Sequence, residues 1–273
     1  MEDIALESPF GNEPLGEVPL AAAPLDLVLT QIRFPRLSAW ARDDQPANDF
    51  ITAMSAEYPI TSQTHELAVT ISPGSVDTAP TSERLWSIAS ADERWKINFG
   101  DAFIAVHTNS YSSRSDFFDR LERALDTFFK IALPPRVDRI GVRYVNRTAD
   151  EEFLEHLATF VRPEMLGTAK LGVSEGVALG QSYCDSVFDF GDTRRLQVRW
   201  GVLPPGAVLD PILPAFDRKS WTLDLDAYAQ RQCEVDTAAV IQEARQLAER
   251  DHRFFRWAVT PQFLKRFGAA DDH

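Results

Sequence analysis

The fold class is decided by residues 113–135, SRSDFFDRLERALDTFFKIALPP. Apolar side chains recur in this stretch at steps of three and four residues, which predicts an amphipathic helix over Ser113–Ile131. Ser113 is a candidate N-cap, and Pro134-Pro135 closes the helix. The apolar face of the expected helix consists of Phe117, Leu121, Ala124, Leu125 and Phe128.

Short runs of β-forming residues precede this helix. A strand is expected at Leu25–Phe34 and a helix at Asn48–Glu57. Turn signals at Pro73-Gly74, Ala91–Glu93 and Gly100-Asp101 then separate four further runs, and this spacing predicts an antiparallel meander. The four runs are Glu66–Ile71, Arg84–Ala89, Arg94–Phe99 and Ala102–Thr108.

The second half of the chain repeats this order. The segment Leu121–Pro135 aligns without gaps on Leu247–Pro261 (LAERDHRFFRWAVTP), with five identities in fifteen positions. We interpret this as an internal duplication, with two amphipathic helices that share packing habits as the alternative. The expected elements of the second half are strands at Asp138–Asn146, Tyr183–Phe190, Arg195–Trp200 and Trp221–Tyr228, a short helix at Glu151–Phe160 and a long one at Thr237–Ala258.

The predicted fold is therefore α+β, with antiparallel sheets packed on two long helices. A mobile acidic and proline-rich arm is expected at residues 1–24, and a short tail at 269–273. Residues 25–268 are expected to form a single domain made of two related halves, about 25–135 and 136–268.

The composition excludes several classes of protein. With 28 basic and 41 acidic residues the net charge is −13, which disfavours bulk nucleic-acid binding. Ordinary solubility is the favoured explanation of this charge, and docking onto basic partners is the alternative. Cys184 and Cys233 are far apart, so neither a disulfide framework nor a zinc cluster is expected. The first 24 residues do not resemble a signal peptide, and no apolar run is long enough to span a bilayer. These features predict a soluble cytoplasmic protein that makes no membrane contact.

The familiar motifs of catalysis are absent from the sequence. It contains no P-loop, no dinucleotide fingerprint, no GxSxG elbow and no HExxH pair, and its five histidines are scattered. We therefore expect neither a metal nor a cofactor, and the catalytic residues stay unassigned.

Arginines gather on one face of the strand RIGVRYVNR. Alternation places Arg139, Arg143 and Arg147 on one side and Tyr144 and Asn146 on the other. Three guanidinium groups on one face could clamp a phosphate or a carboxylate. Ion pairs with acids on neighbouring strands are the favoured alternative in a chain of this charge.

A pair of carboxylates lies on another strand, at Asp224 and Asp226 in WTLDLDAY. Two such groups could bind a cation or act as acid and base. The favoured alternative pairs them with the arginines above and with Arg199 in a polar lattice on the sheet. A third group, His252 beside Asp251 near the end of the last helix, is read as packing because adjacent helical residues diverge.

Four short motifs occur in order along the chain. They are QIRFP at Gln31–Pro35, RIGVRYVNR at Arg139–Arg147, LDLDAY at Leu223–Tyr228 and HRFFRWAVTP at His252–Pro261. Together they resemble the "sporadically distributed" family of bacterial proteins, which carries no assigned activity. Where many members have Leu-His in the final helix, this chain has Asp251-His252. The resemblance implies the patchy distribution of mobile or defence-associated genes and supplies no catalytic residues.

Three functions stay open at this point. The first is a non-catalytic interaction or regulatory protein in a defence or toxin–antitoxin setting, with a partner encoded by a neighbouring gene. The second is a binding protein for an anionic small molecule, and the third is an enzyme that uses Asp224 and Asp226. The expected ligand-binding residues are Arg143, Tyr144, Asn146, Arg147, Trp200, Asp224 and Asp226.

Overall fold

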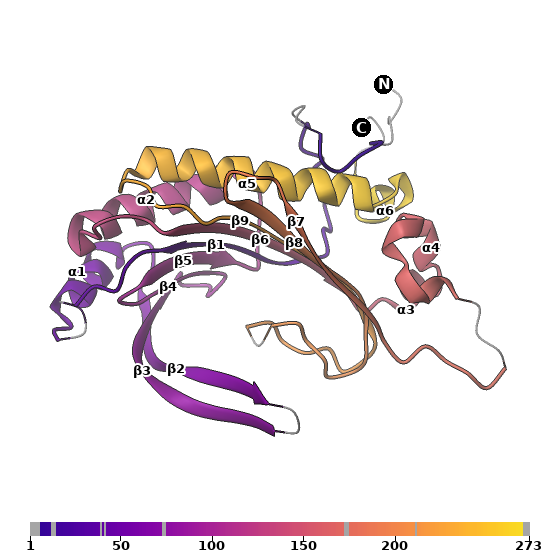
Figure 1. Ribbon diagram of the computed structural model, residues 1–273, viewed down its shortest axis with the longest axis horizontal. Helices are drawn as coiled ribbons and strands as arrows, with labels where there is room; N and C mark the ends of the chain where they lie inside the picture. The colour runs from indigo at the N-terminus through magenta and orange to yellow at the C-terminus, as the bar shows by residue number, and fades with distance from the viewer. Residues whose placement is uncertain are drawn as a thin grey trace. The chain divides into compact units, whose positions relative to one another are not determined.

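Figure 1 shows a computed structural model of the chain. It describes residues 6–11, 15–38, 40, 42–72, 75–171, 175–210 and 212–269, with the backbone alone for 64–72 and 75–84. The expected turn at Pro73-Gly74 and nearly all of the expected tail lie outside the described residues.

The chain divides into two compact units. Unit 1 comprises residues 1–28, 142–229 and 245–273, and unit 2 comprises 29–141 and 230–244. The strands are β1 (Leu25–Arg33), β2 (Ile60–Ser72), β3 (Ser75–Ala89), β4 (Trp95–Phe99), β5 (Phe103–Thr108), β6 (Arg139–Thr148), β7 (Ser182–Asp189), β8 (Arg194–Leu203) and β9 (Ser220–Ala229). The α-helices are α1 (Gln45–Met54), α2 (Arg114–Ala132), α3 (Glu151–Glu155), α4 (Leu157–Phe160), α5 (Thr237–Ala258) and α6 (Pro261–Arg266), with 3-10 helices at Pro163–Met165 and Gly167–Lys170.

Unit 2 carries the meander that the sequence predicts. Its strand order is β2-β3-β4-β5-β1, and the pairs β2–β3, β3–β4 and β4–β5 are antiparallel. The first two strands are much longer than β4 and β5 and extend as a hairpin, as Figure 1 shows. Helix α2 packs on these strands through its apolar face, where Phe117 contacts Trp95 and Phe128 contacts Phe99.

The expected N-cap of α2 is confirmed. The hydroxyl oxygen of Ser113 accepts a hydrogen bond from the backbone N–H of Asp116 at 3.2 Å, which satisfies one of the N–H groups left open at a helix start. The helix ends at Leu133, whose backbone adopts the left-handed conformation with φ of 47°.

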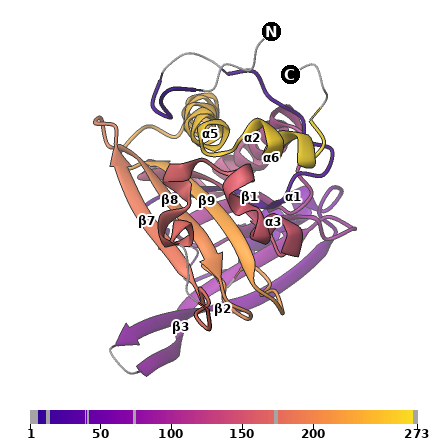
Figure 2. The ribbon, with the colours of Figure 1, turned by 90° about the vertical axis from the view of Figure 1, so that its right-hand side faces the viewer.

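Unit 1 contains a second set of strands in the order β6-β9-β8-β7. The pairs β7–β8 and β8–β9 are antiparallel, and Figure 2 shows β7, β8 and β9 side by side. On one face, Phe254 of α5 contacts Phe188 of β7 with ring centroids 5.8 Å apart. At the other end of the unit, Trp221 of β9 packs against Phe153 of α3 and Phe263 of α6.

A glycine permits the close approach of β7 to β8. Gly201 lies opposite Tyr183 and has a φ of 148°, a conformation that L-residues rarely adopt. A Cβ atom at this position would lie 1.9 Å from the backbone oxygen of Ser182. The residue must therefore be glycine for the β7–β8 ladder to close in this way.

Two helical features of unit 1 differ from the sequence prediction. The helix expected at Glu151–Phe160 is interrupted at His156 and forms α3 and α4 instead. Helix α6 was not expected, although its start carries recognisable signals. The Thr260 hydroxyl accepts the N–H of Phe263, and Pro261 occupies the first helical position.

The α+β class with antiparallel strands is thus confirmed, while the duplication stays a prediction. In each unit the strand that comes first in sequence lies beside the last strand of the meander, β1 beside β5 and β6 beside β9.

None of the helices in the described part of the chain has both the length and the apolar character needed to cross a membrane.

Candidate functional site

Charged side chains gather on one face of the unit 1 strands. In the β8–β9 register Arg199 lies opposite Asp224, and in the β7–β8 register it lies opposite Asp185. Side chains of directly opposed residues share a face, so these three line up across the strands. Arg143 of β6 joins the same row because it contacts Asp224.

The guanidinium group of Arg143 donates hydrogen bonds to two aspartates. Its Nε and Nη2 atoms donate to the two carboxylate oxygens of Asp224 at 2.8 Å each, which is the bidentate geometry of the strongest arginine pairs. Its Nη1 atom donates to Asp210. Burial disfavours the charged form of Arg143, but the hydrogen bonds and charges of Asp224 and Asp210 outweigh it and raise the pKa.

Asp224 binds a second arginine. The Nη2 atom of Arg199 lies 2.6 Å from Asp224 Oδ2, and the Asp224 side chain is 0% exposed. A buried carboxylate needs such partners because a charge taken out of water without compensation costs several kcal/mol. The carboxylate that looked available for acid–base chemistry is therefore engaged by two guanidinium groups.

Arg147 has a separate set of partners. Its Nη1 atom donates to Asp26 at 2.9 Å, and its Nη2 atom donates to the carbonyl oxygen of Pro214 at 2.8 Å. The guanidinium carbon lies 4.4 Å from the centre of the Phe216 ring, in cation–π geometry. Burial lowers the pKa of Arg147, and the charge of Asp26 opposes this shift.

The loop that joins β8 to β9 covers this face. It supplies Asp210, the Pro214 carbonyl and the Phe216 ring, and Figure 1 shows it in orange between its two strands. The Asp210 carboxylate also accepts the backbone N–H of Ile212 at 3.0 Å. Burial raises the pKa of Asp210, but the bond from Arg143 and this backbone bond together lower it.

We call these six residues the ion-pair cluster. Three arginines face three aspartates, so their formal charges cancel. The members are Asp26, Arg143, Arg147, Arg199, Asp210 and Asp224. Three of the five guanidinium N–H groups of Arg143 already donate to carboxylates, so an anionic ligand would meet an arginine that is largely neutralised by its own aspartates.

The other expected ligand-binding residues are distributed over both faces of the strands. Trp200 lies opposite Leu223 and so points away from the face that carries Arg199. Tyr144 and Asn146 alternate with Arg143 and Arg147 along β6 and lie on the face opposite to them. Asp226 shares the face of Asp224, opposite Gln197, whose amide donates to Asp185 at 3.0 and 3.1 Å.

Strand β7 lies at the edge of its sheet, and among the described residues only its first residue, Ser182, is shown to bond to the 3-10 helix Gly167–Lys170, through Thr168 at 2.8 Å. It is the last strand of its sheet order, so no described strand pairs with its outer side. Tyr183 and Val187 are 44% and 55% exposed, and they alternate with the exposed acids Asp185 and Asp189. Such an edge presents alternate backbone N–H and C=O groups to any extended chain that approaches it.

A second group of buried charges lies on α5. Asp251 is 1% exposed, and burial together with the charges of Asp226 and Asp224 raises its pKa well above the usual range. The backbone N–H of Ala227 opposes this shift, but no hydrogen bond of normal geometry reaches either carboxylate oxygen among the described residues. Arg253 is also buried, and sequence reasoning assigned a role to neither residue.

No family model matches the chain, and neither a curated protein nor a solved structure matches it. The resemblance to the "sporadically distributed" family therefore stays a prediction.

Proposed function

We propose that this chain is an interaction protein that binds an extended, basic segment of a partner along β7, without catalysing a reaction. The single observation that carries the proposal is the open, partly apolar edge of β7. Strand addition supplies affinity through backbone hydrogen bonds, and specificity through alternate side chains.

The side chains of β7 favour a basic partner. Exposed Asp185 and Asp189 flank Val187, so a strand with basic and apolar residues in alternation would match them. The Asp189 carboxylate already accepts the Gly191 N–H and the Arg195 guanidinium, which lower its pKa and keep it ionised. The net charge of −13 steers basic segments toward the protein in the same way.

The ion-pair cluster supports binding over catalysis. The carboxylate of Asp224, which the enzyme alternative requires, accepts bonds from Arg143 and Arg199 and is shielded from solvent.

Selection from a library of extended ten-residue peptides, with the full chain as bait, tests this proposal. We expect the enriched peptides to alternate Lys or Arg with apolar residues. Hydrogen exchange of the complex should then show new protection of amides within Ser182–Asp189. The double variant Asp185→Lys with Val187→Lys should weaken binding about tenfold or more, because lysines on an edge oppose strand addition.

Leu133→Lys is the matched control, since Leu133 is a large exposed apolar residue of unit 2. It should leave peptide affinity unchanged. Protection confined to another part of the chain, or a double variant that binds as tightly as the original protein, would show that β7 is not the binding edge.

Two further proposals extend the sequence expectations. The two units share an order of elements, which is a strand, one or more short helices, an antiparallel meander and a long helix. This shared order supports an internal duplication. The family resemblance supports a partner encoded by a neighbouring gene in a defence or toxin–antitoxin setting.

A further inference from the structure

Part of the expected N-terminal arm lies on unit 1. The Phe10 ring contacts the rings of Phe188, Phe190 and Phe254, with centroids 4.8, 5.9 and 6.3 Å away. The backbone N–H of Leu15 donates to Glu249 Oε1 at 3.1 Å. These contacts hold the described arm residues against α5, and the expected mobility of the arm stays a prediction.

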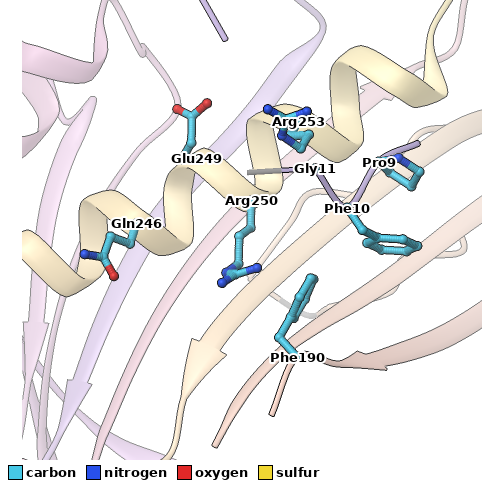
Figure 3. Close-up of a pocket in the computed structure, with 8 residues that line it drawn as sticks. All are labelled: Pro9, Phe10, Gly11, Phe190, Gln246, Glu249, Arg250 and Arg253. Carbon is cyan, nitrogen blue, oxygen red and sulfur yellow. The ribbon is translucent and has the colours of Figure 1, made fainter. Parts of the chain in front are cut away.

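A cavity of about 210 Å³ lies between the arm and α5. Figure 3 shows Phe10 and Phe190 on one side of the helix, Arg250 reaching toward Phe190, and Arg253 beside Gly11. Its walls therefore combine two aromatic rings with two guanidinium groups. This combination of an apolar wall and a few polar groups is typical of small-molecule sites.

Arg253 stands out among the residues that line the cavity. It is only 5% exposed, and its Nη2 atom has no hydrogen-bond partner in the described part of the chain. Gly11 allows this packing, because a Cβ atom there would lie 2.8 Å from Arg253 Nη1. A buried N–H group without a partner is costly, so an anion that accepts a hydrogen bond from Nη2 would be stabilised.

The lining of the cavity carries a net positive charge. Asp251 is close in sequence, but its raised pKa favours the neutral form. Arg250 lies with its guanidinium carbon 4.1 Å from the centre of the Phe190 ring and adds a second positive charge. With Glu249 as the one acid, the lining carries a formal charge of +1 in a chain of −13.

We propose that this cavity binds a small monoanionic carboxylate with an aromatic or apolar body. The carboxylate pairs with the guanidinium of Arg253, and the body lies against Phe10 and Phe190. The arm residues form one wall, so the arm and the ligand hold each other in place. None of the residues that line this cavity belongs to β7, although Phe10 also contacts Phe188, and the test does not depend on the proposed peptide binding.

The test compares phenylacetate with phenylacetamide, which has nearly the same shape and no charge. Titration calorimetry and thermal unfolding of the full chain measure binding of each compound. We expect phenylacetate to bind and to raise the unfolding temperature, with phenylacetamide about tenfold weaker or more because it lacks the charge-assisted bond. Acetate and inorganic phosphate, which carry no ring, should bind more weakly than phenylacetate.

Arg253→Gln should abolish the preference for phenylacetate over phenylacetamide. Arg245→Gln, on the same helix and outside the cavity lining, is the matched control and should retain it. The unliganded Arg253→Gln protein should unfold at the same temperature as the original or higher, because the buried Nη2 group that lacks a hydrogen-bond partner has been removed.

Phe10→Ala provides an independent variant should Arg253→Gln fail to fold. It should lower phenylacetate affinity at least about threefold by removing one aromatic wall. Equal binding of the acid and the amide, equal binding of acetate and phenylacetate, or a preference that survives Arg253→Gln would each overturn the proposal.

Discussion

The two units share an order of elements but fill their interiors differently. In unit 2 the core is a contiguous group of rings, in which Phe50 contacts Phe99 and Phe128 at 4.8 and 5.2 Å and Trp86 stacks on Phe99. Unit 1 has an aromatic core too, around Phe153 and Phe263. It also buries five Arg and Asp residues, whereas Glu243 is the one buried Arg, Asp or Glu of unit 2 in the described part of the chain.

The difference teaches that a similar arrangement of strands can be stabilised by apolar packing alone or with a covered row of charges. Apolar packing loses stability when volume is removed. A buried ion pair gives little net stability, but breaking it leaves an uncompensated charge. Substitution of a buried charged residue should therefore lower the unfolding free energy more in unit 1 than substitution of a charged residue does in unit 2.

The largest effect is expected from Asp224→Ala. This change leaves Arg143 without its bidentate partner and Arg199 without its 2.6 Å contact. We expect a loss of about 3–5 kcal/mol of unfolding free energy, measured by urea denaturation.

Asp226→Ala is the control for this prediction, because it removes a carboxylate from the same face of the same strand at a more exposed position. It should cost less than about 1 kcal/mol. Equal losses for the two variants would mean that the ion-pair cluster holds no special place in the stability of unit 1.

The next effect concerns His107 of unit 2. Burial first, and the positive charge of Lys96 directly across the β4–β5 ladder second, lower the pKa of His107 to about 4. The unfolded chain binds a proton near pH 6.5 and the folded one does not, so stability is lost as the pH falls from about 6.5 to about 4. The loss should reach about 3 kcal/mol at pH 4.

His107→Gln should flatten this part of the stability curve, followed by urea denaturation at half-unit steps of pH. His156→Gln, at an exposed position of unit 1, is the control and should leave the curve unchanged. A curve for His107→Gln that still falls as steeply as the original would refute the assignment.

The smallest of these effects has the opposite sign and belongs to unit 1. The pKa of Asp251 is raised, so above about pH 4 the unfolded chain releases a proton that the folded chain retains. Stability is therefore lost as the pH rises. Asp251→Asn cannot ionise and should be more stable than the original by about 1 kcal/mol or more at pH 8, since one pKa unit corresponds to about 1.4 kcal/mol.

The gain from Asp251→Asn should shrink toward pH 4, where the aspartate of the unfolded chain also begins to bind a proton. Asp126→Asn on the exposed face of α2 is the comparison and should change stability little at either pH. A gain of the same size at pH 4 and pH 8 would show that ionisation of Asp251 is not the cause.

Much of the secondary structure could be predicted from local patterns. The bounds of α5 agree with the expectation, and β1 and β4 differ from it by one residue. The expected strands at Glu66–Ile71 and Arg84–Ala89 are the central or final parts of longer strands. Their added residues are mostly polar, as in Ile60–His65, so hydrophobic alternation gave no signal for them.

The site was predictable only in part. Alternation correctly places Arg143 and Arg147 on one face of β6, and Asp224 and Asp226 on one face of β9. Which residues pair with these arginines and aspartates depends on the β8–β9 register and on the loop that carries Asp210. Neither can be recognised from a local sequence pattern. Arg253 could not be predicted as a binding residue, because this role is inferred from its burial and from an Nη2 atom without a hydrogen-bond partner among the described residues.

The separation in sequence of the cluster's members has a consequence for the order of folding. Asp26 and Arg147 are 121 residues apart, and Arg143 and Asp224 are 81 apart. Closing chain segments of this length costs conformational entropy before any contact is gained. We therefore expect these charges to stay hydrated during early collapse, when unit 2 can already form its sequential hairpins. We expect the ion-pair cluster to form late, because unit 1 can exclude water from this face only after β1, β6 and β9 have reached their correct register.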